Sequence, residues 1–275
     1  MTKHCRLVFL ALLSVLVILF QPVVRAQEEE RVFDFDQAYQ DYTYNYNLYL
    51  GAHKEYLVAK NQYETFQTLT SKTIALEQTT KMLQARDEVV ATFLTAYRIR
   101  FADKTNVATG TLNLLYLQLE QEAEWYREHR LGLTSAGTIP DLITLSNEAQ
   151  NRYGQTQSLV YQSLLEMYLY QESLLHNQLD KLVAQVETTI AGIRTEGEKD
   201  TTSVERWLLE TQNRKTRGEE KLAEAQAYEI TSRDRRDNML QTYNRTVAQI
   251  EESHQYLKEA NKALQEIIKE IRRAD

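Results

Sequence analysis

The sequence predicts an all-α protein: an elongated bundle of long helices, arranged as helical hairpins or coiled coils, behind an N-terminal signal peptide. Turn-forming residues are scarce, with 2 prolines and 8 glycines in 275 residues. Residues of high helix propensity (Leu, Ala, Glu, Gln, Lys and Arg) are abundant instead. Apolar residues also recur at spacings of three and four over long stretches, which is typical of helices that pack side by side.

The first 26 residues differ from the rest. Lys3 and Arg6 precede an apolar run over residues 7–20, and Val24-Arg25-Ala26 follows. This is the layout of a secretory signal peptide cleaved after Ala26. An uncleaved signal anchor is the alternative, because the apolar stretch is close to the minimum of about 17 residues for a spanning helix. Either one places the body outside the cytoplasm, so we expect a secreted or extracytoplasmic protein of the periplasm or cell envelope, membrane-anchored if the signal stays uncleaved.

Domain boundaries follow from this division. Residues 1–26 are the predicted signal peptide, 27–33 a short acidic lead-in, and 34–275 the helical bundle. Polar stretches and helix-end signals divide the bundle into four helices, at about 34–101, 111–130, 140–194 and 202–273. Pro140 suits the first turn of the third helix, where its missing N–H costs nothing. Thr202 and Glu205 have the spacing of a capping box at the start of the fourth.

The first predicted helix is unusually rich in tyrosine, with seven between residues 39 and 63. Tyr42, Tyr49, Tyr56 and Tyr63 are spaced by seven, and Phe66 continues the same line. The simplest interpretation is a seam that packs against another helix, with the hydroxyls reaching water at its margin. The alternative is a surface that binds a glycan or a protein, and Tyr44, which lies off the line, is its best candidate for exposure.

The last predicted helix contains a second seam with strict spacings of three and four. Its members are Leu240, Tyr243, Val247, Ile250, His254, Leu257, Asn261, Leu264, Ile268 and Ile271. Such a pattern is typical of a left-handed coiled coil. Polar residues within a seam often fix register or partner number, and this is the role we expect for His254 and Asn261.

The third predicted helix has a different period. Leu142, Tyr153, Leu164, Leu175 and Val186 are each eleven residues apart. An eleven-residue repeat corresponds to about 3.67 residues per turn, which predicts a straight or slightly right-handed seam.

Composition and motifs narrow the function classes. The chain has 32 Lys and Arg against 39 Asp and Glu; without Lys3, Arg6 and Arg25 the balance becomes 29 against 39, a net charge of −10. An acidic body argues against nucleic-acid binding and against docking on anionic lipid. Cleavage would also remove Cys5, the only cysteine.

The sequence gives little support for a catalytic or metal-binding site. The motifs G-x-S-x-G, G-K-[ST] and H-E-x-x-H do not occur. A di-iron bundle needs two Glu-x-x-His motifs, and only Glu251–His254 has this form. His53, His129 and His176 are isolated, which favours ordinary positions on a helix surface or seam edge. We therefore expect no enzyme activity, no metal and no cofactor.

The sequence thus predicts an exported, non-enzymatic coiled-coil protein, a structural, spacer or adaptor component of the cell envelope. It would act through helix–helix contacts with a protein partner or by self-association. Two alternatives stay open: an extracytoplasmic holdase-type chaperone, and a ligand-binding helical sensor bundle.

Overall fold

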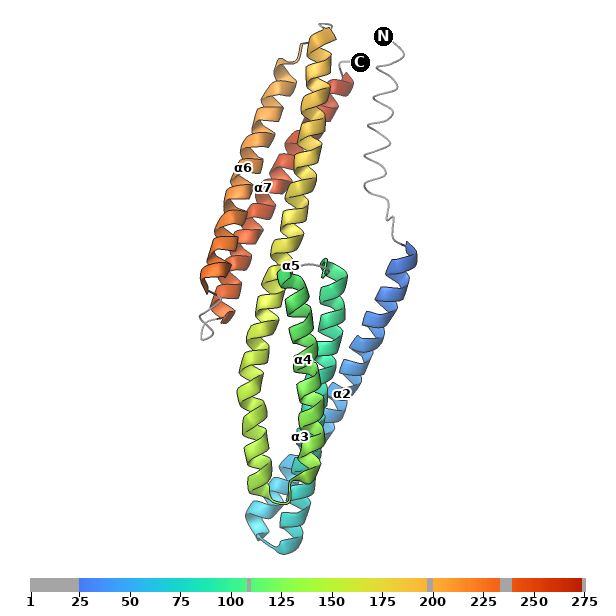
Figure 1. The fold of residues 1–275 in the computed structure, drawn as a ribbon, viewed down its shortest axis with the longest axis vertical. Coiled ribbons are helices and arrows are strands. Elements are labelled where there is room, and N and C mark those ends of the chain that lie inside the picture. The colour runs from blue at the N-terminus through green and yellow to red at the C-terminus, as the bar shows by residue number, and fades with distance from the viewer. Residues whose placement is uncertain (1–24, 108–109, 197–199, 233–238, 274–275) are drawn as a thin grey trace.

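The computed structural model describes residues 25–107, 110–196, 200–232 and 239–273, and this part of the chain is all helical (Figure 1). Its helices are α2 (Arg25–Phe66), α3 (Leu69–Lys104), α4 (Gly110–Gly132), α5 (Ile139–Glu196), α6 (Thr202–Ser232) and α7 (Met239–Arg273), with a short 3-10 helix, η1 (Leu133–Ser135), between α4 and α5. The prediction of an all-α bundle is confirmed. The predicted signal peptide lies outside the described residues except for its last two, and the predicted lead-in 27–33 belongs to α2 rather than preceding it.

The first predicted helix, 34–101, is a hairpin of two helices rather than one. The chain reverses at Gln67, whose φ of 50° lies in the left-handed region. Thr68 then caps α3: its hydroxyl accepts from the Ser71 backbone N–H, and the Ser71 hydroxyl accepts in return from the Thr68 N–H. This reciprocal cap satisfies two donors that a new helix would otherwise leave unpaired.

The fourth predicted helix, 202–273, is likewise divided. α6 ends at Ser232, α7 begins at Met239, and the two lie side by side in opposite directions (Figure 1). The second and third predicted helices agree with α4 and α5 to within two residues at each end.

One helix joins two bundles. The first half of α5 packs against α3 and α4, with α2 laid on α3; the second half packs against α6 and α7 (Figure 1). Each bundle has its own apolar core, around Phe101 and Tyr126 in the first and around Leu179 and Ile267 in the second. None of the described helices has an apolar stretch long enough to cross a membrane.

The buried face of α5 follows two heptad frames and not the predicted eleven-residue repeat. Two lines of buried positions, each with members seven apart, follow its length: Leu142, Ala149, Thr156 and Ser163 in the first half, and Leu169, His176, Val183 and Ile190 in the second. A step of six separates the two lines, and Leu165, Glu172 and Leu179 are buried beside the second line. The step shifts the buried face to a new set of neighbours. Tyr153 and Leu175, members of the predicted repeat, are exposed.

Candidate functional site

The tyrosine line of α2 lies where a seam would lie. Tyr42, Tyr49, Tyr56 and Tyr63 are all half-buried, in register with the buried Ala38 and Ala59. Tyr42 makes an edge-on contact with Phe93 of α3, with ring centroids 5.7 Å apart. Large rings alternating with alanines let two helices approach closely.

Other apolar residues of α2 face away from this seam. Tyr39, Tyr46, Leu50 and Leu57 are between 41% and 54% exposed. Together with Thr43 and His53 they form a second line with spacings of four and three, which we call the outer stripe. Tyr44, 64% exposed, lies outside both lines, and Phe66 is 67% exposed at the α2–α3 turn instead of continuing the seam. The outer stripe has the spacing that is typical of a helix–helix contact. In the described part of the chain, no helix packs on it.

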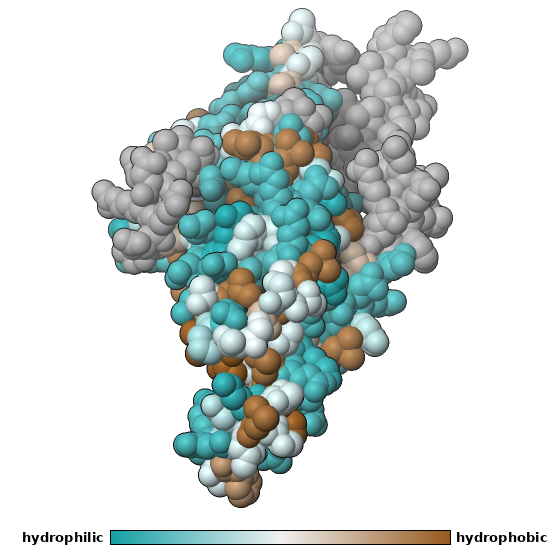
Figure 2. Space-filling view, turned by 60° about the horizontal axis from the view of Figure 1, so that its bottom comes forward, coloured by the Kyte–Doolittle hydropathy of each residue, from teal (hydrophilic) through white to brown (hydrophobic). Residues whose placement is uncertain are grey.

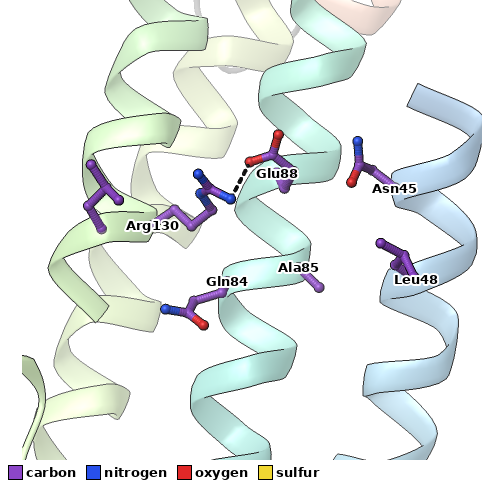
Figure 3. Close-up of a pocket in the computed structure, with 7 residues that line it drawn as sticks. Asn45, Leu48, Gln84, Ala85, Glu88 and Arg130 are labelled. Atoms are coloured by element: carbon purple, nitrogen blue, oxygen red, sulfur yellow. Dashed lines mark ion pairs between the residues drawn. The ribbon is translucent and has the colours of Figure 1, made fainter. Parts of the chain in front are cut away.

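A groove of about 310 Å³ lies beside α2. Figure 3 shows Asn45 and Leu48 on α2, Gln84, Ala85 and Glu88 on α3, and Arg130 on α4. The Arg130 guanidinium pairs with Glu88 at 2.9 Å. On the face shown in Figure 2, apolar residues form several separate patches among the polar ones. The α2 side of the first bundle therefore offers a shallow, mixed surface next to exposed apolar side chains.

The buried face of α7 differs from the predicted seam at alternate positions. Ile250, Leu257 and Leu264 are buried, while Tyr243 and Ile271 are half-buried, as a seam requires. The other buried positions are Met239, Thr242, Thr246, Ser253, Ala260, Ala263 and Ile267, each one residue before a predicted member.

The predicted members at those alternate positions lie at or beyond the seam edge. Leu240 and Asn261 are exposed, whereas Val247, His254 and Ile268 are half-buried. From Ile250 onward, the buried seam positions are spaced three and then four residues apart, whereas the predicted members are spaced four and then three apart. Small residues such as Ser253 and Ala260 fill the buried positions because α6 and α7 lie close together.

His254 and His176 meet a buried glutamate between α5 and α7. Ser253 Oγ donates to Glu172 Oε1 at 2.9 Å and lies 2.9 Å from His176 Nε2, so it accepts from that nitrogen. His254 Nδ1 lies 3.2 Å from Glu172 Oε2. Gly218 of α6 closes the group: a Cβ there would lie 3.1 Å from His176 Cε1. We call this cluster the α5–α6–α7 joint.

His176 is held neutral by this environment. Its Nδ1 is buried and has no hydrogen-bond partner among the described residues. Burial lowers the pKa of His176, while the neighbouring carboxylates, Glu172 foremost, act in the opposite direction. A proton on Nδ1 would find no acceptor, which agrees with the lowered pKa.

A second polar cluster, the α3–α4–α5 joint, lies in the first bundle. His129 Nδ1 lies 2.6 Å from Asp87 Oδ2, and its Nε2 lies 3.1 Å from the Leu145 carbonyl oxygen. Arg86 completes the cluster by donating to Asp87 and to Ser146. Asp87 is fully buried, and the cluster joins Arg86 and Asp87 of α3 to His129 of α4 and to Leu145 and Ser146 of α5. His129 and His176 are therefore buried residues that link helices, not the surface or seam-edge residues that their isolation in the sequence favoured.

Neither joint has the geometry of a reactive centre. In a catalytic triad the carboxylate bonds the histidine and so orients it as a base for the serine. In the α5–α6–α7 joint Glu172 instead accepts from the Ser253 hydroxyl, and His176 Nδ1 has no partner among the described residues. Ser253 is fully buried, so a substrate cannot reach its hydroxyl in this conformation. Among the described residues, no three His, Cys, Asp or Glu side chains converge as metal ligands would.

No family model, curated protein or solved structure matches the chain.

Proposed function

We propose that this protein is an exported, non-enzymatic coiled-coil protein that serves as a structural, spacer or adaptor component of the cell envelope. Its binding element is α2, which docks a helix of a protein partner or of a second copy. The observation that carries the proposal is the outer stripe, an apolar line at helix-contact spacing that no described helix covers.

The position of α2 supports this role. α3 is its main neighbour, whereas α3, α4 and α5 surround a common core. A partner that covered the exposed tyrosines and leucines of this helix would gain about 25 cal/mol of hydrophobic free energy for each Å² of apolar surface buried. Contiguous exposed apolar surface of this kind marks interaction sites in soluble proteins.

A helix is the partner that fits the stripe. Apolar residues at spacings of three and four form the knobs and holes of helix pairing, and a strand or loop has no matching period. The long bundle behind α2 would hold this surface at a distance from its other end, as a spacer does.

The test is capture from the native envelope with a photo-crosslinking residue placed at Thr43, an exposed position of the outer stripe. We expect one or two proteins, or a second copy of the chain, at fixed stoichiometry by mass spectrometry. Leu50→Glu with Leu57→Glu should abolish capture from an unaltered, equally stable fold. Gln37→Glu with Gln62→Glu adds the same charge to exposed positions on the opposite face of the same helix, and should leave capture intact.

Two results would overturn the proposal. Capture that survives the leucine substitutions would exclude the outer stripe as the docking surface. Many unrelated proteins at low stoichiometry would instead indicate the holdase-type chaperone.

A further inference from the structure

A second groove lies between the first half of α5 and the first turns of α7, which run side by side in Figure 1. It has a volume of about 760 Å³. Pockets of about 300–1,000 Å³ are the usual size for small-ligand sites. Size alone does not make a site, and the chemistry of the lining is what distinguishes this groove.

The lining is rich in amides and contains no charge among the described residues. Five of its ten lining residues are Asn151, Gln155, Gln157, Gln241 and Asn244. In a chain with 26% charged residues, ten lining positions would ordinarily include two or three. The other two grooves follow that expectation, since one holds the Glu88–Arg130 pair and the other is lined by acidic and basic side chains of α6 and α7.

The amides are also available. Within the described part of the chain, none of the five side chains forms a hydrogen bond or an ion pair. Each offers two N–H donors and a carbonyl acceptor side by side. Tyr161 adds an aromatic face next to them, with the Tyr243 ring 5.3 Å away.

We propose that this groove binds a neutral oligosaccharide chain. A sugar presents hydroxyls that donate and accept, which pairs of amide groups can bond in both directions, and a C–H face that packs on an aromatic ring. Among the described lining residues, a charged ligand would find no counter-charge to offset its lost hydration. An apolar ligand would leave the five amides unpaired once water is displaced. A peptide is the closest competitor, because Met239, Leu240 and Tyr161 give the groove an apolar side, but the described residues offer no sheet edge to pair with a peptide backbone.

This inference is independent of the proposed function, because no residue of the groove belongs to α2. If both hold, the protein joins a helical partner at α2 to a glycan at α5. Loss of either interaction should leave the other unchanged, so their failures are distinguishable.

The experiment is calorimetric titration of the purified protein with neutral tetrasaccharides: maltotetraose, cellotetraose and chitotetraose. We expect at least one to bind with a Kd of about 1 mM or tighter. Gln155→Ala with Gln241→Ala should weaken binding about tenfold, because the hydrogen bonds of two amide side chains to the sugar are lost. Gln178→Ala removes an exposed amide from the same helix outside the groove and should change nothing.

Asn244→Gln provides a sharper control. It preserves an amide in the groove while removing the formal glycosylation sequon Asn244-Arg245-Thr246, so binding should be retained within a few-fold. The inference is overturned if none of the three sugars binds, if the double alanine variant binds as tightly as the parent, or if an uncharged tetrapeptide such as tetra-asparagine binds at this groove and the sugars do not.

Discussion

Replacing Gly218 with alanine tests how tightly the α5–α6–α7 joint is packed. In an open helix interior, glycine to alanine stabilises by about 1 kcal/mol because alanine has the higher helix propensity. At Gly218 the new Cβ would lie 3.1 Å from His176 Cε1, 3.4 Å from the Ser253 carbonyl oxygen and 3.5 Å from the Tyr256 Cβ. The His176 ring is fixed by its bond to Ser253, and the other two neighbours belong to, or lie next to, the α7 backbone.

The expected magnitude follows from these two effects. Overpacking a tight site costs about 1–3 kcal/mol, which outweighs the gain in propensity. Gly218→Ala should therefore lower the free energy of unfolding by about 1 kcal/mol. Gly192→Ala is the matched control, because nothing lies within 4 Å of a Cβ at that position of α5. It should raise the free energy of unfolding by about 0.5–1 kcal/mol.

Urea unfolding followed by circular dichroism measures both variants. The two free energies should differ by about 2 kcal/mol, with the parent between them. Equal stabilisation by both substitutions would refute the reasoning, since it would show that α6 has room beside His176.

Four further substitutions test other parts of the structure. Because burial lowers the pKa of His176 below its ordinary value of 6.5, protonation favours the unfolded chain; the parent should lose stability relative to His176→Gln as the pH falls below about 6.5. Tyr49→Ala and Tyr56→Ala should each lower the free energy of unfolding by about 2 kcal/mol, roughly half the cost of truncating a fully buried aromatic residue. Asp87→Ala should cost about 3–5 kcal/mol, because it leaves His129 without its buried carboxylate.

Each of these has its own control and contrary result. A parent and His176→Gln that lose stability in parallel between pH 7 and pH 5 would exclude His176 as the titrating group. Leu50→Ala, on the outer stripe, should barely alter the melting temperature, and a loss as large as that of Tyr49→Ala would mean that the stripe is packed. Glu77, which pairs with Lys81 at the surface, is the reference for Asp87: Glu77→Ala should cost less than about 1 kcal/mol, and similar losses for the two would contradict a buried role for Asp87.

The all-α class could be predicted because helix-favouring composition and apolar spacing are present along the whole chain. The reversal between α2 and α3 could not be predicted in this way. It takes place at Gln67 and Thr68, with neither glycine nor proline, and depends on a cap that Ser71 completes. Threonine and serine three apart occur elsewhere in helices, so the pattern becomes a helix start only where α2 can fold back on α3. A search for turn residues passes over it.

The α7 seam and the two joints were missed for a related reason. The predicted spacing places Val247 and His254 on the seam, whereas the structure buries the smaller Thr246 and Ser253. Small polar residues become seam residues when a partner helix comes close and their hydroxyls find acceptors inside it. Asp87 and His129 are 42 positions apart, and no spacing rule relates two residues on different helices. Treating Ser, Thr and Ala as possible seam members would have recovered the register of α7, but not the pairing within either joint.

The continuity of α5 determines how the two bundles can move. Its 58 residues extend about 87 Å at about 1.5 Å per residue, without a loop between the part that packs on α3 and α4 and the part that packs on α6 and α7. Relative motion of the bundles therefore requires α5 itself to bend or twist, since no loop separates them. A torque applied to one bundle would be transmitted to the other through the backbone hydrogen bonds of this one continuous helix.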